Sequence, residues 1–162
     1  MKKPVCLVSA CLAGVNCRHD DGNRLDSRIT KLVAEGRAIP VCPEQLGGLP
    51  TPRTEADIAD GTGPDVLDGQ ARVIDREGRD VTAHFIRGAR EVLQIAKTAG
   101  TTLAILKENS PSCGCRRTYT RDADGRSRRV EGQGVTAALL SREGLRVISE
   151  EELDGQPGGP RA

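Results

Sequence analysis

Aromatic side chains are almost absent from this chain of 162 residues. Phe85 and Tyr119 are the only two, and tryptophan does not occur. Proteins that bind extended single-stranded nucleic acid stack successive bases on aromatic side chains, so this scarcity argues against such a surface. A planar small molecule needs a single ring beside it, and Tyr119 or His19 could supply that ring.

An excess of charge and a long apolar run are also missing. The 24 Lys and Arg residues nearly balance the 23 Asp and Glu residues, so the net charge of +1 gives no general reason to bind nucleic acid or membrane. No apolar segment reaches the roughly 18 residues that span a bilayer, and the run after Met-Lys-Lys is too short for a signal peptide. We therefore expect a cytoplasmic protein without a nucleic-acid or membrane partner, in an oligomeric state that the sequence leaves open.

The length is that of one domain, and we expect a single α/β domain over residues 1–153 followed by a disordered tail over residues 154–162. Strands are predicted over residues 4–10, Ala38–Val41, Leu103–Leu106 and residues 145–149. Helices are predicted after Asp26, from Asp80 or Thr82 to Gly100, and over Val135–Arg142. Alternating strands and helices predict a small, mainly parallel, Rossmann-like sheet flanked by helices.

Three segments fit no such element. Residues 43–64 are rich in proline and glycine and are predicted to form an ordered loop over the site that acts as its lid. Residues 71–74 followed by Asp75-Arg-Glu-Gly78 predict a small hairpin. The charged residues 116–129 are consistent with either a second hairpin or a flexible excursion.

Three cysteines each follow the end of a predicted strand: Cys11, Cys42 and Cys113. In open parallel sheets, ligands bind outside the carboxyl ends of the strands. Reducing thiol pools disfavour disulfides in the cytosol, which makes metal or redox chemistry the better explanation for six cysteines. We expect these three thiols to converge on one metal centre at the carboxyl edge of the sheet.

The other cysteines have different expectations. Cys6 lies inside an apolar strand and is expected to be a core residue. Cys115 is expected to be incidental, because its side chain points away from that of Cys113 in an extended turn. Cys17 could be a fourth ligand, a resolving thiol or a structural thiol.

The spacing of the cysteines bears on the metal. Zinc sites favour local pairs such as Cys-x2-Cys, and no such pair occurs here. Dispersed thiolates suit an iron–sulfur cluster as well or better. A cluster with three thiolate ligands leaves one iron open, and this Lewis acid would favour a sulfur atom of a substrate.

Other residues near these cysteines could take part in the chemistry. Glu44 is two residues after Cys42 and is a candidate general acid or base, although most carboxylates are solvated surface groups. Ser110 is a candidate proton relay, although a serine before proline is often only a turn residue. Gly132 and Gly134 open a helix whose free N–H groups could bind a carbonyl or an anion, or could serve as a mere helix entry.

Five motifs together resemble the bacterial thiouracil desulfidase family, in order and in spacing, over nearly the whole chain to about Leu153. They are SACLAGVNCRHDDG (residues 9–22), CPEQLGGLPTPR (42–53), DVTAHFIRGA (80–89), LKENSPSCG (106–114) and GQGVTAALL (132–140). One departure is that His19-Asp20-Asp21 stands where relatives read Tyr-Asp-Gly, so the rim of the pocket is expected to differ.

The resemblance implies a non-redox enzyme with an oxygen-sensitive [4Fe-4S] cluster. Cys11, Cys42 and Cys113 would be its three ligands, and the fourth iron would bind the sulfur of the substrate. Glu44 and Ser110 would be the catalytic acid/base and its helper. The reaction implied is hydrolysis of a thiolated pyrimidine, of the 2-thiouracil or 4-thiouracil type, to uracil and sulfide. The alternative is a regulatory module that binds zinc or an iron–sulfur cluster without turnover.

Overall fold

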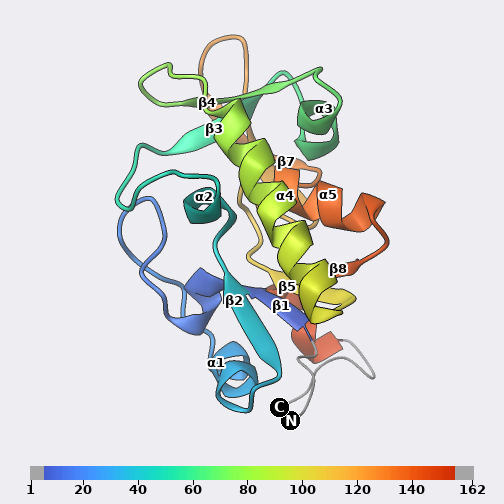
Figure 1. Ribbon diagram of the computed structural model, residues 1–162. Coiled ribbons are helices and arrows are strands. Elements are labelled where there is room, and N and C mark those ends of the chain that lie inside the picture. The colour runs from blue at the N-terminus through green and yellow to red at the C-terminus, as the bar shows by residue number, and fades with distance from the viewer. Residues whose placement is uncertain (1–5, 156–162) are drawn as a thin grey trace.

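The fold contains two four-stranded sheets, and one long helix packs on both of them (Figure 1). The computed structural model describes residues 6–155. The long helix, α4 (Thr82–Ala99), crosses the molecule from one sheet to the other. Within the described residues, no helix is both long enough and apolar enough to cross a membrane.

The first sheet contains the four strands that the sequence predicts: β1 (Cys6–Ser9), β2 (Ala38–Val41), β5 (Leu103–Leu106) and β8 (Arg146–Ser149). They lie in the order β2-β1-β5-β8, and each neighbouring pair is parallel. Ala10, which was predicted to end the first strand, instead begins a 3-10 helix, η1 (Ala10–Ala13). Residues 4–5 of the predicted strand lie outside the described part of the chain.

The predicted helices begin and end where their capping residues place them. Helix α1 (Ser27–Ala34) has Asp26 as its N-cap, and the Asp26 carboxylate accepts the Arg28 N–H at 3.0 Å. At the start of α4, the Asp80 carboxylate accepts the Thr82 N–H at 2.9 Å. That helix stops at Gly100, which adopts the left-handed conformation with φ of 69°. Helix α5 (Val135–Arg142) has the predicted bounds.

Apolar side chains cover both faces of the parallel sheet. On one face, Val8 and Ile105 pack with Ile29 and Leu32 of α1. On the other face, the apolar residues of the sheet pack with those of α4 and α5, among them Leu7, Ala104, Leu106, Val92, Ala96 and Leu140. The expected α/β architecture, with a mainly parallel sheet flanked by helices, is therefore confirmed.

The second sheet was not predicted. It contains β4 (Arg72–Asp75), β3 (Ala56–Ala59), β6 (Arg117–Arg121) and β7 (Ser127–Glu131), in that order. Strands β3 and β6 are parallel, and the two outer pairings are antiparallel. Of the two alternatives for residues 116–129, the hairpin is correct.

The prediction that residues 43–64 form no regular element was wrong. Residues 43–64 contain α2 (Pro43–Leu46), β3 and the start of α3 (Gly63–Leu67). The predicted hairpin after residues 71–74 is present in a short form. Ile74 forms an antiparallel bridge with Asp80, and the Asp75 N–H donates to the Arg79 carbonyl at 2.9 Å, while the other edge of β4 pairs with β3. At the C-terminal side, η2 (Glu150–Gly155) includes the first two residues of the predicted tail, and residues 156–162 lie outside the described part.

Candidate functional site

A cavity of about 790 Å³ lies where β1, β2 and β5 end. Ser9 and Val41 end the first two strands, Lys107 follows the third, and all three residues line the cavity. The cavity wall also includes Asp57 of β3 and Tyr119 of β6, two strands of the second sheet. The cavity therefore lies between the carboxyl ends of the parallel strands and the second sheet.

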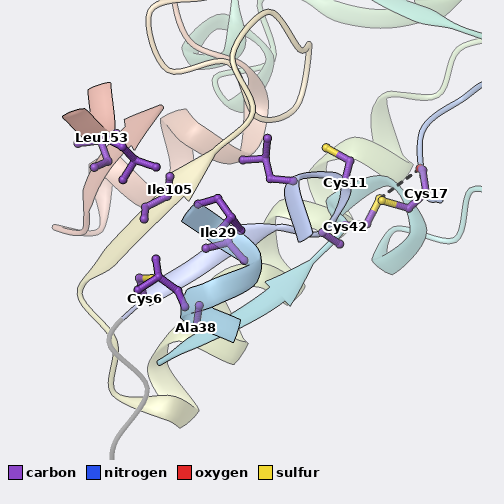
Figure 2. Packing of buried hydrophobic residues seen from close by; sticks show 13 residues of the cluster. Cys6, Cys11, Cys17, Ile29, Ala38, Cys42, Ile105 and Leu153 are labelled. Atoms are coloured by element: carbon purple, nitrogen blue, oxygen red, sulfur yellow. Dashed lines mark hydrogen bonds between the residues drawn. The ribbon is translucent and has the colours of Figure 1, made fainter. Parts of the chain in front are cut away.

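The three predicted ligands, Cys11, Cys42 and Cys113, all line this cavity. Cys11 is part of η1, directly after β1, and Cys42 follows β2 as the N-cap residue of α2. Cys113 lies in the turn after β5. Each is nearly buried, with 4–9% of its surface exposed. Figure 2 shows Cys11 and Cys42 on neighbouring segments, with Cys17 beside Cys42.

Hydrogen bonds fix the turn that carries Cys113. The Ser110 hydroxyl oxygen accepts the N–H of Cys113 at 3.0 Å and that of Ser112 at 3.2 Å. The Ser110 carbonyl accepts the N–H of Gly114 at 3.0 Å. Ser110 also lines the cavity, so it both caps this turn and faces the site.

Glu108 also holds this turn, and sequence reasoning missed it. Its side chain is 1% exposed, and one carboxylate oxygen accepts three backbone N–H groups, from Cys115, Arg116 and Arg117, at 2.8–3.0 Å. Burial raises the pKa of Glu108, but the amide donors lower it more, so its pKa lies below the usual range. A glutamate inside a polar turn gives no sequence signal that distinguishes this role from a solvated one.

The N–H groups of Gly132 and Gly134 are not free donors, contrary to the expectation from sequence. Gly132 N–H donates to the Arg116 carbonyl at 2.7 Å, and Gly134 N–H donates to the Gly114 carbonyl at 2.9 Å. A Cβ atom on Gly134 would lie 2.6 Å from the Ser112 carbonyl oxygen. Gly134 therefore permits the start of α5 to pack directly on the Cys113 turn.

Glu44 lines the cavity and is paired with Arg53, a residue that the sequence analysis did not single out. Arg53 Nη2 lies 3.6 Å from Glu44 Oε2, and both side chains are largely buried. Arg53 Nη1 donates to the Pro50 carbonyl at 3.2 Å and to the Thr51 hydroxyl at 3.1 Å. Residues of the segment 43–64, which was predicted to lie over the site, do line it, and the ion pair joins two positions within that segment.

Burial makes two of the three thiols, those of Cys11 and Cys113, hard to ionise. Burial raises the pKa of Cys11 to about 11, with the charge of Glu44 as the second cause, and burial also raises the pKa of Cys113 far above its ordinary value. Arg18 and Lys107 oppose the shift at Cys11. Thiolates at these two positions therefore require a compensating positive charge.

Cys17 is 2% exposed and lines the cavity beside Cys42. A Cys42 thiol can donate to the Cys17 carbonyl, which is 3.7 Å from Cys42 Sγ. When Cys42 loses its proton, the Cys17 thiol donates to it instead, which lowers the pKa of Cys42 and raises that of Cys17.

The remaining two cysteines do not line the cavity. Cys6 is fully buried in the core, as predicted. The Cys115 thiol contacts the Leu106 and Cys113 carbonyls at 4.0 and 3.5 Å, and burial raises its pKa.

The donor set suits a cluster of several iron atoms. Among residues 6–155, no three His, Cys, Asp or Glu side chains are gathered closely enough to hold a single metal ion. A polynuclear cluster needs thiolates that reach different iron atoms from its periphery. Cys11, Cys42 and Cys113 come from three segments around one cavity, which fits this requirement.

Comparison with known proteins gives three matches. The model of the family described as 2-thiouracil desulfurase matches residues 6–152. The Bacillus subtilis (strain 168) protein YbbK, described as uncharacterized, is 47% identical over 148 residues, which cover 91% of this chain and 97% of YbbK. The solved structure of the [4Fe-4S]-dependent thiouracil desulfidase TudS superposes with a TM-score of 0.79 at 41% identity, covering 95% of each chain.

Proposed function

The chain belongs to the 2-thiouracil desulfurase family, and from this premise we propose that it is a [4Fe-4S]-dependent enzyme. It hydrolyses a thiolated pyrimidine, of the 2-thiouracil or 4-thiouracil type, to uracil and hydrogen sulfide. One water molecule is consumed, and no electrons are transferred. The observation that carries the proposal is the set of three buried thiols around one cavity, in a chain 41% identical to TudS.

Cys11, Cys42 and Cys113 would hold the cluster. As its three protein ligands, they would leave one iron with an open position, and the chemistry that such an iron would supply is that of a Lewis acid toward the thiocarbonyl sulfur. Lys107 and Arg18 line the cavity and contribute positive charge beside Cys11. Lys107 is held in place by Glu150, with Nζ 3.1 Å from Oε2.

Glu44 accepts a proton from the water molecule that attacks the thiocarbonyl carbon. Glu44 lines the cavity, and its ion pair with Arg53 restricts its orientation. A general base needs both a fixed position and access to the water that it activates. Glu44 combines the two.

Ser110 passes a proton toward the departing sulfur. Its oxygen already accepts two backbone N–H groups, from Ser112 and Cys113. A hydroxyl has two acceptor lone pairs and one donor hydrogen, so the remaining capacity of Ser110 is to donate. Because Ser110 lines the cavity, its donor hydrogen is available to the substrate.

A second candidate function is a cluster- or zinc-binding regulatory module without turnover. The observation that favours it is the position of Cys17, which lines the same cavity as the three proposed ligands. With Cys17 as a fourth ligand, the site would be closed to substrate.

Anaerobic purification separates the two functions. The enzyme is expected to be brown, to contain about four irons per chain, and to release sulfide from 2-thiouracil or 4-thiouracil. Cys17→Ser should keep both the irons and the turnover. A colourless protein with zinc, or loss of the metal in Cys17→Ser, would support the regulatory module. A screen of thiolated bases and nucleosides, followed by loss of thiocarbonyl absorbance, then identifies the substrate.

A further inference from the structure

All four aromatic side chains of this chain, with histidine counted among them, line the same cavity. The sequence contains two histidines, one phenylalanine, one tyrosine and no tryptophan. His19, His84, Phe85 and Tyr119 are all part of the cavity wall. In a chain so poor in rings, this concentration indicates a cavity suited to a flat, unsaturated ligand.

Three of these rings are already engaged within the protein. Phe85 is 3% exposed and belongs to the apolar core around Ile58 and Val73. The His84 ring nitrogen Nδ1 lies 2.8 Å from the Gly47 carbonyl oxygen. His19 Nε2 lies 3.6 Å from Glu55 Oε1. These contacts fix the three rings to their own surroundings.

Tyr119 differs from them. It is half-buried on β6, and no residue between 6 and 155 forms a hydrogen bond with its phenol. Its neighbours in the strand are anchored: the Thr118 hydroxyl donates to the Ser110 carbonyl at 3.0 Å, and the Thr120 hydroxyl donates to the Ile58 carbonyl at 2.9 Å. Thr118 thus ties the strand that carries Tyr119 directly to the turn that carries Cys113.

We propose that Tyr119 is the aromatic wall on which the planar ring of the substrate stacks. This inference rests on the proposed desulfidase function and names the group that orients its substrate. A stacked pyrimidine is held by its face, which leaves its edge and thiocarbonyl group free to point toward the thiols and Glu44. The ligand class is a flat heteroaromatic thiocarbonyl, and a non-planar or acyclic thioamide gains nothing from this wall.

The composition of the chain supplies a direct readout. With one tyrosine and no tryptophan, the emission of the protein reports on Tyr119 alone when it is excited at wavelengths too long for phenylalanine to absorb. Titration of the cluster-loaded enzyme with uracil, the unreactive product, should change this emission and reach saturation. Free N-acetyl-tyrosinamide in the same solutions corrects for light absorbed by uracil. Saturable binding of uracil by another method with unchanged emission would overturn the proposal.

Kinetics of three variants complete the test. Tyr119→Leu should raise KM for the thiopyrimidine by about 5- to 160-fold, the range expected for one stacked base, with a much smaller change in kcat. Tyr119→Phe keeps the ring and should restore the wild-type KM. Arg128→Leu, on the same hairpin but exposed and outside the cavity wall, is the control for damage to the hairpin.

An unchanged KM in Tyr119→Leu, or a failure of Tyr119→Phe to restore it, rejects the stacking role. The proposed function fails separately, if the wild-type enzyme releases no sulfide from any thiopyrimidine. Normal turnover by the wild type together with a Tyr119 that does not respond rejects only the stacking wall.

Discussion

Replacement of each cysteine by serine tests which thiols hold the proposed cluster. Cys11→Ser, Cys42→Ser and Cys113→Ser should each abolish cluster binding, because a site with three thiolate ligands has no spare. Cys6→Ser and Cys115→Ser are the matched controls, and both should retain the cluster, since neither thiol lines the cavity. Iron content and the visible spectrum after anaerobic purification measure the effect. Full occupancy in any of the first three variants would contradict the ligand assignment.

Glu44 separates catalysis from cluster assembly. Glu44→Gln keeps the shape of the side chain and removes its ability to accept a proton, so turnover should fall by roughly 10²- to 10⁴-fold. The cluster spectrum should stay unchanged, because a general base does not hold iron. Sulfide release and the spectrum are measured on the same sample. A lost cluster would make Glu44 a ligand or a structural residue, and undiminished turnover would place the base elsewhere.

Ser110→Ala is expected to have two effects that can be told apart. Loss of the hydroxyl removes the proposed proton donor, and a water molecule can partly replace it, so the loss of turnover should be milder than in Glu44→Gln. It also removes the acceptor for the Cys113 and Ser112 N–H groups, so the cluster should be lost faster in air. Ser110→Thr keeps the hydroxyl and is the control. Full turnover in Ser110→Ala would exclude the proton-relay role.

Among whole elements, those with a strong local signal were predicted and those held by distant contacts were not. The capping carboxylates of Asp26 and Asp80 and the stop at Gly100 mark α1 and α4 in the sequence itself. The strands of the parallel sheet are short apolar runs because helices cover both faces. Local patterning was therefore sufficient for this sheet and its helices.

The second sheet has no comparable signal. In β7, four of five residues are exposed, and β3 contains one fully buried aliphatic side chain, Ile58. Its polar residues line the cavity or pair with each other, as Asp57 does with the Ser127 hydroxyl at 3.1 Å. These contacts join residues far apart in the chain, and local sequence patterns do not reveal them. The sequence therefore indicated the cysteines of the site, but it did not indicate the wall that the second sheet forms or the position of Tyr119 in that wall.

The Cys113 turn depends on an ionised Glu108. Glu108→Gln should lower the free energy of unfolding of the cluster-free protein at neutral pH by about 1–3 kcal/mol, because a neutral amide accepts the three backbone N–H groups less strongly. The folded-state pKa of Glu108 lies below the ordinary value of 4.5. Its contribution is therefore present above that value and is lost as the pH falls through the lower folded-state pKa.

Urea unfolding at several pH values measures this effect. The difference between the wild type and Glu108→Gln should shrink as the solution becomes more acidic. Glu91→Gln, an exposed position in α4, is the control and should have little effect at any pH. A difference that does not change with pH would mean that the charge of Glu108 is not what stabilises the turn.

For the whole molecule, the proposed cluster is a cross-link between distant parts of the chain. Two of its ligands follow β1 and β2 near the N-terminal end, and the third follows β5 after the long helix α4. An ionised Cys11 is unfavourable without a positive partner, as its raised pKa indicates, so the Cys11 thiol stays protonated in the apoprotein. The loaded protein would in addition be joined at three points at this edge of the sheet.

Removal of the cluster should consequently lower the thermal stability of the entire domain. A ligand bound only by the folded state, at 100 times its dissociation constant, adds about 2.7 kcal/mol, which corresponds to a Tm higher by about 5–10 °C for a chain of this size. Anaerobic thermal unfolding of loaded and chelator-treated protein measures the difference. Cys113→Ser should melt at one temperature whether or not iron and sulfide are supplied, because it cannot hold the cluster. Equal melting temperatures for loaded and cluster-free wild-type protein would show that the three segments are already fixed by the packing of α4 and α5, and that the cluster serves chemistry alone.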